Sequence, residues 1–383
     1  HKAQHSTQHT AHIAAQHTMA EDLYPTTLQA LRASLDPYTP REQREACTSF
    51  LQQLRSSPHC LPVLARVLGQ PTDAAEAQEV AAAQAQGGAQ GGYADLLALG
   101  VQGQGQGQGL EVVGADVKLL ALSVLNEGIK ATWNDLGDGD RGAVRALAWA
   151  LMISPLGIHP HSAVRTKIAV ILINVAERVF PQYWPGLMQE IVSEWMQAPF
   201  ARQDLLLRTL EGIVSDVIDT DFCAALPALR RQEIAAGVVA AQDLLLPTCY
   251  SYLLYCAGQL EQGAGAGPHT QALLSLLSLL SALSSLIKSD LLCAPTHNFS
   301  LPLVPLMNSP VQSKAASLLL DIVSRKLPPQ QFAAVLYAVA NFELRILPAD
   351  LEESLLFQRT YAAALHTLLS THLGGGGTSG AGP

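Results

Sequence analysis

The sequence predicts an all-α protein made of antiparallel helix pairs, and three observations support that fold class. Hydrophobic residues make up 49% of the chain but aromatic residues only 5%, so Leu and Ala supply most of the core. Apolar residues recur at helical spacing in stretches of about 12 to 20 residues. Pro, Asp or Gly separates these stretches, and none shows the sustained alternation of a strand.

The first helices begin and end at recognisable residues. Asp36-Pro37 ends a helix that starts at about Leu23. Thr39-Pro40 then caps a second helix, which has Glu42 as its third residue and runs to about Arg55. Further predicted helices span 61–68, 117–133, 142–153, 162–180, 184–197 and 202–218.

The second half continues the same pattern. Residues 225–256 form one long helix or a broken pair, kinked where Pro247 removes a backbone donor. The remaining predicted helices span 270–288, 311–325, 331–344 and 352–372. About seven pairs at a spacing of roughly 40 residues are typical of a HEAT or armadillo solenoid. A plain helical bundle would need short, uniform loops, so the long insertions favour a HEAT-repeat α-solenoid.

Low-complexity segments divide the chain. We expect a disordered leader at 1–18, first HEAT repeats at 20–73 and a disordered Gln/Gly/Ala-rich insertion at 74–110. Further HEAT repeats at 111–260 and 270–373 flank a flexible break at 261–269, and a Gly-rich tail occupies 374–383. In the leader, His1, His5 and His9 could stack on one helix face and bind a metal, but an unselected leader ahead of Met19 explains them better.

Charge and hydropathy exclude several classes of protein. The net charge of −9 argues against a basic coat for nucleic acids. The apolar run at 273–287 is shorter than the ~20 residues that span a bilayer, so we predict a core helix and no membrane insertion. The first eighteen residues do not resemble a secretory signal. Six Cys without a C-x-x-C pair suggest buried thiols in a reducing cytosolic or nuclear compartment.

No enzyme motif is present in the sequence. The Gly-Gln run at 103–109 follows no strand, so it is no dinucleotide fingerprint. Asp138 and Asp140 are expected in a solvated turn, and Glu352/Glu353 at a helix start. His159 and His161 flank Pro160 without a third ligand, which favours a solvated turn over a metal site. We therefore expect no catalytic residues, cofactor or metal.

The most distinctive stretch, 164–192, contains a helix followed by Pro181-Gln-Tyr-Trp184-Pro185. It resembles the exportin-1/importin-β-like region of the karyopherin/importin-β superfamily. Pro181 would stop one helix, Trp184 would pack in the corner as a core residue, and Pro185 would start the next helix at its first turn. Weaker segments between about 20 and 372 narrow the resemblance to the exportin 5 and plant HASTY group: 35–37 with 44–46, 131–134, 205–219, 227–234 and 316–326.

The resemblance implies a nuclear export receptor that binds Ran-GTP through its N-terminal repeats and shuttles between nucleus and cytoplasm. Its cargo would be structured RNA, such as a pre-miRNA or a tRNA-like molecule, or a protein; it would meet nucleoporins and act as a monomer. Polar residues of the second helix in each pair are the candidate Ran face: Lys118, Asn126, Lys130, Arg165, Lys167, Asn174 and Arg178. Arg230-Arg231 is a candidate RNA-binding patch. An import receptor of the same superfamily and a HEAT scaffold without transport activity remain alternatives.

Overall fold

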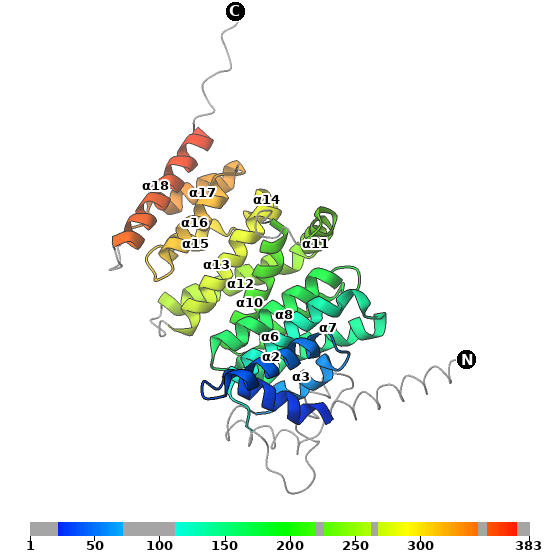
Figure 1. Cartoon of the computed structure of the whole chain (residues 1–383). Helices are drawn as coiled ribbons and strands as arrows, with labels where there is room; N and C mark the ends of the chain where they lie inside the picture. Colours follow the sequence, from blue (N-terminus) through cyan, green and yellow to red (C-terminus); the bar gives the residue numbers. More distant parts are fainter. Residues whose placement is uncertain are drawn as a thin grey trace, which may run out of the picture. The chain divides into compact units, whose positions relative to one another are not determined.

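The computed structural model describes residues 22–71, 112–218, 226–261, 267–325, 327–343 and 351–373. The predicted leader, the insertion, the tail and most of the break at 261–269 lie outside these residues, as do the three spaced histidines of the leader. Throughout the described ranges the regular structure is helical and no strand occurs (Figure 1). The predicted all-α class is confirmed.

The chain divides into two compact units, His1–Val175 and Ala176–Pro383. The boundary falls inside one helix, α8. The helices of the first unit are residues 22–35, α2 (Arg41–Arg55), α3 (Cys60–Leu68), α6 (Ala115–Thr132), η1 (Trp133–Asp135), α7 (Asp138–Ile153), η2 (Pro155–Ile158) and most of α8 (Ser162–Val179).

Helix α6 is the centre of the first unit. It packs against both α2 and α3, and its Val124 and Leu125 are fully buried. At Gly128 the approach is so close that an added Cβ would lie 2.8 Å from Cys60 Sγ and 3.3 Å from the carbonyl oxygen of Arg55. Packing between the helices therefore favours a residue without a side chain at this position.

The two helices on either side of the Gln/Gly-rich segment are neighbours in space. α3 and α6 pack together, and the Val113 N–H donates to the Pro71 carbonyl oxygen at 2.9 Å. The described chain therefore leaves at Pro71 and returns beside it at Val113, so the segment between them does not separate the two helices.

The second unit contains the end of α8 and ten further helices among its described residues. They are α9 (Leu187–Gln197), α10 (Phe200–Ile218), α11 (Ala228–Ala240), α12 (Gln242–Glu261), α13 (Pro268–Leu286), α14 (Ser289–Leu292), α15 (Ser300–Leu306), α16 (Gln312–Val323), α17 (Pro329–Ala340) and α18 (Leu351–Leu373). α14 and α15 are short and were not predicted, because Pro and polar residues interrupt the apolar spacing between 289 and 306.

The helices of the second unit form two layers of a regular array. The first layer, which we call layer A, contains α9, α12, α15 and α17, and each helix contacts the next. Layer B contains α10, α13, α16 and α18, which also contact one another in order. Each A helix packs on its own B helix, from the α9–α10 pair to the α17–α18 pair. This nearest-neighbour pattern is that of a HEAT-like solenoid, as predicted.

Helix α13 confirms the predicted core helix. His269–Leu286 is the one described helix that by length and composition could cross a membrane, and half of that window is buried. The bent pair α11–α12 passes the same test only if its two helices are counted together. α13 packs on α10, α12 and α16, and Leu276 and Leu280 are buried. Its apolar character is therefore used in packing between helices.

Two predicted boundaries were wrong. The break in 225–256 falls at Ala241, with a bend of 63° between α11 and α12, whereas Pro247 is accommodated inside α12. A proline removes only one helical hydrogen bond, and the packing of α12 on α9, α13 and α15 offsets that loss. α7 starts at Asp138, so Asp138 and Asp140 lie in its first turn, where carboxylates are favourable, rather than in a separate turn.

The predicted cap of α2 is also wrong. The N-cap residue is Pro40, and no side chain caps the helix. The Thr39 hydroxyl donates instead to the carboxylate of Asp36 at 3.1 Å. Local hydrogen bonds of Thr and Asp compete with helix capping, and here the Thr39–Asp36 hydrogen bond forms instead of a cap.

Candidate partner-binding site

The stretch with the Pro-x-x-Trp-Pro pattern forms a compact corner after α8. α8 ends at Val179, just before Pro181, as predicted. Trp184 is buried, and its Nε1–H donates to Glu190 Oε1 at 2.9 Å. Trp184 is therefore a core residue, as expected. Pro185 does not start the next helix: α9 begins at Leu187 after Gly186, because Trp184 and Pro185 are still part of the turn.

Arg230, near the start of α11, ties this corner to the next helix pair. Its Nε–H donates to the Glu177 carbonyl oxygen at 2.8 Å, and another guanidinium N–H donates to the carbonyl oxygen of Phe180. It also bonds the side chains of Gln182 and Glu233, the latter at 2.8 Å. The hydrogen bond from Arg230 lowers the pKa of Glu233. The guanidinium thus satisfies carbonyls at the C-terminal end of α8.

This arrangement corrects the interpretation of Arg230-Arg231 as an RNA-binding patch. The guanidinium of Arg230 donates to backbone carbonyl oxygens at the end of α8. Arg231 donates to the Leu226 carbonyl oxygen at 3.3 Å. Sequence reasoning identified two adjacent cations but had no means of finding the carbonyls that they meet.

Gly237 of α11 packs directly on the corner. An added Cβ would lie 2.7 Å from Phe180 Cε1 and 3.2 Å from Pro181 Cβ. The ring of Phe180 is itself buried. The small residue and the Arg230 contacts therefore fix α11 against the end of α8.

The first unit brings together two members of the predicted Ran face, but they face each other. Asn174 Nδ2 donates to Asn126 Oδ1 at 2.8 Å, which joins α8 to α6. Asn126 is buried, and Lys118 is completely buried on the same helix. All three positions were predicted to face a partner. In the structure Asn126 and Lys118 are buried, because α6 packs on several neighbouring helices, and Asn174 is half-buried.

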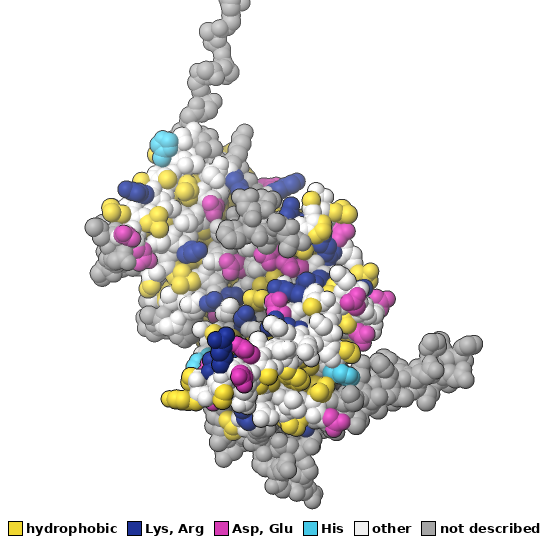
Figure 2. Space-filling model, viewed as in Figure 1, with side chains coloured by type: hydrophobic (Ala, Val, Ile, Leu, Met, Phe, Trp, Pro, Cys, Tyr) yellow, Lys and Arg dark blue, Asp and Glu magenta, His cyan; other side chains and the backbone are white. Residues whose placement is uncertain are grey.

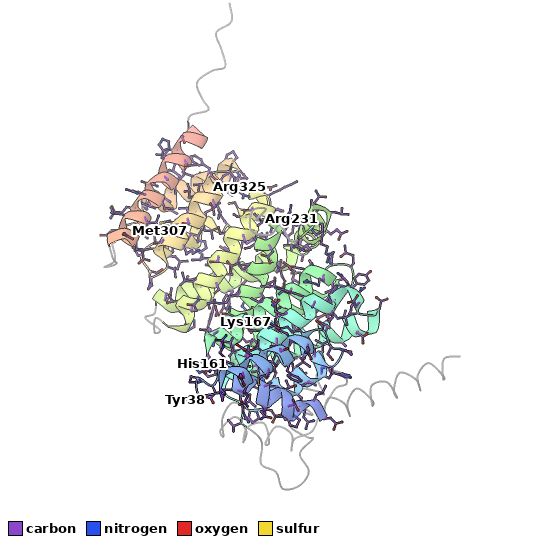
Figure 3. All side chains as sticks on the ribbon, viewed as in Figure 1. Tyr38, His161, Lys167, Arg231, Met307 and Arg325 are labelled. Atoms are coloured by element: carbon purple, nitrogen blue, oxygen red, sulfur yellow. The ribbon has the colours of Figure 1, made fainter. Side chains whose placement is uncertain are left out.

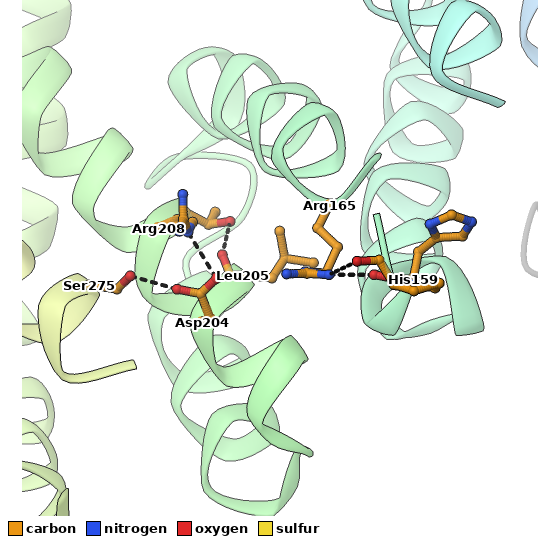
Figure 4. Close-up of polar contacts among 8 residues, drawn as sticks. His159, Arg165, Asp204, Leu205, Arg208 and Ser275 are labelled. Atoms are coloured by element: carbon orange, nitrogen blue, oxygen red, sulfur yellow. Dashed lines mark hydrogen bonds and ion pairs between the residues drawn. The ribbon is translucent and has the colours of Figure 1, made fainter. Parts of the chain in front are cut away.

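Two other predicted residues of this face are engaged within the fold. Arg165 donates to the carbonyl oxygens of His159 and Pro160, the latter at 3.2 Å, and so holds the loop before α8 (Figure 4). Arg178 is half-buried, and its burial lowers its pKa, with the nearby Glu177 carboxylate opposing that shift.

The remaining two cations are the accessible ones. Lys130, near the end of α6, is exposed and lies 3.5 Å from Glu127 Oε1. Lys167 on α8 is partly exposed (Figure 3). A surface pair such as Lys130–Glu127 contributes little to stability, so a partner can exchange for Glu127 at low cost.

The loop with two histidines differs from the predicted solvated turn. His159 is buried, its Nδ1 accepts from the backbone N–H of His161 at 3.1 Å, and the two rings lie 5.5 Å apart. The contacts from Arg165 pull this loop onto the helix, which explains the burial of His159. Among the described residues, no group of three or more His, Cys, Asp or Glu could hold a metal ion.

Layer B carries a chain of polar contacts that sequence reasoning missed. Asp204 of α10 is buried, pairs with Arg208 at 3.0 Å and accepts from the Ser275 hydroxyl of α13 at 2.6 Å (Figure 4). Ser281 donates to Asp321 of α16 at 2.8 Å. The repeated serines of 275–285 were the available signal, since they are unusual in an otherwise apolar helix.

Glu211 adds a titratable group to layer B. Its burial raises its pKa, while Lys314 and Arg208 lower it. Basic and acidic side chains therefore alternate along the polar side of these helices. Figure 2 likewise shows Lys and Arg interspersed with Asp and Glu on the face in view, with no continuous basic field.

The cysteines are buried as predicted wherever the structure describes them, apart from Cys47, which is half-exposed. Burial raises the pKa of the Cys60 and Cys249 thiols to about 12 and that of Cys256 to about 11. Cys223 lies outside the described residues. These thiols pack as small hydrophobic groups and are poor nucleophiles.

The geometry described above is that of stacked helix pairs with a buried Trp corner between α8 and α9. Residues 161–320 match the family model described as Exportin 1-like protein. The match covers less than half of the chain and runs from the start of α8 into α16, so it includes the corner and most of the two-layer array. No curated protein matches the chain.

This match supports a relation to the karyopherin/importin-β superfamily. The members of this superfamily are transport receptors and not enzymes. Residues 161–320 therefore resemble a transport receptor.

Proposed function

We propose that the chain is part of a nuclear export receptor of the exportin 5/HASTY type, which binds Ran-GTP and carries structured RNA or protein from the nucleus to the cytoplasm. The observation that carries this proposal is the exportin 1-like match over 161–320, because it coincides with the corner and the layered helix pairs. Shuttling would bring the receptor into contact with nucleoporins, and we expect it to act as a monomer.

We propose Lys130 and Lys167 as the residues of the candidate Ran face that contact the GTPase. Both side chains are accessible, whereas Lys118 and Asn126 are buried and Arg165 holds a loop. Opposite charges across an interface mainly raise the association rate and the specificity. The Ran contact should therefore weaken as the salt concentration rises.

The layered array gives a physical route from GTPase binding to cargo binding. The helix pairs of the second unit contact mainly their neighbours, so curvature can change by small adjustments at many interfaces. A GTPase that prefers one curvature then changes the affinity for cargo that prefers the same one, and the coupling is reciprocal.

The charge of the chain limits how it would hold RNA. The net charge of −9 is unfavourable for RNA phosphates, and the donors of Arg230 are directed to backbone carbonyls. The affinity of this chain for RNA should therefore fall steeply as the salt concentration rises. It should also be lower than that of a receptor with a continuous basic groove.

The test is a titration of the purified 383-residue chain with Ran loaded with GTP or with GDP. The test variant is Lys130→Glu/Lys167→Glu, and the matched control is Arg41→Glu/Lys288→Glu, which changes the net charge equally at two other exposed cations. We expect binding of the GTP form only, a loss of at least about tenfold in affinity for the test variant, and little change for the control.

The outcomes separate the alternatives. Equal binding of both nucleotide forms, or none, would contradict the Ran-GTP proposal and favour a HEAT scaffold without transport activity. If Ran-GTP bound but released cargo instead of retaining it, the chain would be an import receptor. If the two double variants lost affinity equally, the effect would be one of net charge, and the proposed contact residues would be wrong.

A further inference from the structure

The loop between the first helix and α2 carries a Pro-x-Thr-Pro sequence, Pro37-Tyr38-Thr39-Pro40, that the proposed transport function does not use. Tyr38 is 91% exposed, the two prolines are exposed and Thr39 is partly exposed (Figure 3). Pro40 has φ −52° and ψ 143°, which is an extended, polyproline-like conformation. The loop therefore projects from the helices with a hydroxyl in its middle.

The Thr39 hydroxyl is held only by an exposed acceptor. It donates to Asp36 Oδ2 at 3.1 Å, and Asp36 Oδ1 also accepts from the Tyr38 backbone N–H at 2.9 Å. It does not cap α2. Freeing this hydroxyl therefore costs only one solvent-exposed hydrogen bond.

A cation without a carboxylate partner lies under the same loop. One guanidinium nitrogen of Arg44 donates to the carbonyl oxygens of Asp36, Pro37 and Thr39 at 3.0–3.1 Å. The Arg44 Nε–H is buried and has no acceptor among the described residues, and Arg44 forms no ion pair within the described chain. Arg44 therefore places a positive charge beside Thr39 that no carboxylate of the described chain neutralises.

We propose that Thr39 is a phosphorylation site for a proline-directed protein kinase and that Arg44 receives the phosphate. In the transfer, the Thr39 Oγ1 attacks the γ-phosphorus of ATP, the bond from that phosphorus to ADP breaks, and the hydroxyl proton passes to the kinase. Proline after the acceptor suits a kinase that offers no partner for the backbone N–H at that position, since Pro has none. Phosphate on Thr39 adds about −1.5 to −2 charges, for which an arginine fork is the favoured partner.

Asp36 determines what phosphorylation would change. The modified oxygen can no longer donate, and two negative groups would then lie where one hydrogen bond was. The phosphate and the Asp36 carboxylate would repel each other, so the Asp36 side chain would turn out into solvent and the phosphate would turn toward Arg44. The modification would restructure this loop at the start of α2 without touching the cores of the helices.

Three other sites in the chain have Ser before Pro, and they serve as internal controls. They are Ser57-Pro58, Ser154-Pro155 and Ser309-Pro310, and none has a proline two residues before the serine. The Ser154 and Ser309 hydroxyls donate to the carbonyl oxygens of Leu151 and Leu306, which are at helix ends. Ser57 Oγ accepts from the His59 backbone N–H. The Ser154 and Ser309 hydroxyls are thus bonded to helix carbonyls, and Ser57 lies in the tight turn between α2 and α3, whereas the Thr39 hydroxyl bonds only the exposed Asp36 carboxylate.

The first experiment treats the folded 383-residue chain with a mitogen-activated protein kinase and ATP, and follows each site by phosphopeptide mass spectrometry. We expect an initial rate at Thr39 at least about tenfold above that at each of the three serines, and a loss of at least about tenfold in Pro40→Ala. Thr39→Ser should retain modification. Equal rates at all four sites, or a Pro40→Ala variant modified as fast as the parent chain, would overturn the proposal; melting curves of each variant confirm that it is folded.

The second experiment tests Arg44 by ³¹P nuclear magnetic resonance of the phosphorylated chain. A guanidinium next to the phosphate lowers its second pKa below the usual value of about 6. We expect that lowering in the parent chain and a return to the usual value in Arg44→Gln, with Arg41→Gln as the matched control. An identical titration in all three proteins would show that Arg44 does not receive the phosphate.

Discussion

At two helix crossings in this protein a glycine lies in close contact with the neighbouring segment, and the atoms that each glycine meets are of different kinds. In the first unit, Gly128 of α6 faces the Cys60 thiol and the Arg55 carbonyl oxygen at the α2–α3 junction. In the second unit, Gly237 of α11 faces the rings of Phe180 and Pro181 at the corner after α8. A thiol can rotate away from an added methyl group, but a buried ring cannot. The corner should therefore tolerate change less well than the α6 crossing.

The largest expected effect tests the corner itself. Trp184→Ala should destabilise the chain by about 3–5 kcal/mol, because it removes a buried indole and leaves a cavity. Trp184→Phe keeps most of the packing but removes the Nε1–H donor to Glu190, and should cost about 0.5–1.5 kcal/mol. Chemical denaturation measures both, and an unchanged midpoint for Trp184→Ala would show that the corner is not part of the core.

The second-largest expected effect depends on how rigidly the Phe180 ring is held against α11. Gly237→Ala should destabilise by a net amount of about 1–2 kcal/mol, since overpacking against Phe180 outweighs the better helix propensity of Ala. Gly258→Ala is the matched control, because an added Cβ there meets no atom within 4 Å. If Gly237→Ala and Gly258→Ala had the same free energy of unfolding, contact with the Phe180 ring would not determine the cost of the added methyl group.

A smaller effect is expected at the other crossing. Gly128→Ala should cost between zero and about 1 kcal/mol, because the Cys60 thiol can rotate and the helix gains propensity. In a Cys60→Ala background the same substitution should be less costly, which a double-mutant cycle measures directly. A cost at Gly128 that exceeds the one at Gly237 would reverse the comparison.

The smallest effect concerns the thiol at this crossing. Burial raises the pKa of Cys60 to about 12 from its ordinary 9.0, so the folded state retains a proton that the unfolded state releases. Its contribution to stability is therefore complete below pH 9 and declines as the pH rises toward 12. At pH 8, alkylation of Cys60 should be at least about a hundredfold slower than that of Cys47, measured by mass spectrometry. Similar rates would mean that the crossing opens readily.

Helical periodicity was sufficient to predict much of the fold. It predicted α2, α3, α6, α8, α10, α13 and α16 to within a few residues, because each has one wide apolar stripe between breakers. It failed at Pro247 and between 289 and 306, where the outcome depends on packing by neighbouring helices or on irregular spacing. The position of Trp184 in a buried corner could be predicted because Pro181 and Pro185 restrict the chain on both sides.

The candidate site could be predicted only in part. Periodicity identifies polar positions on a helix but not which of them another helix covers. Lys130 and Lys167 are accessible, whereas Lys118 is buried and Asn126 is paired with Asn174 across two helices. Likewise Arg230 and Arg231 look like a basic patch in the sequence, yet Arg230 holds the end of α8.

The sequence by itself therefore determined the helical class, the pairing of successive helices and the buried tryptophan, because these depend on residues close together in the chain. Only the tertiary structure decided the role of Arg230, the close approaches at Gly128 and Gly237, and the Asp204–Ser275 contact between α10 and α13. Each of these depends on two or more segments far apart in sequence, and a local pattern contains no information about the distance at which such segments meet.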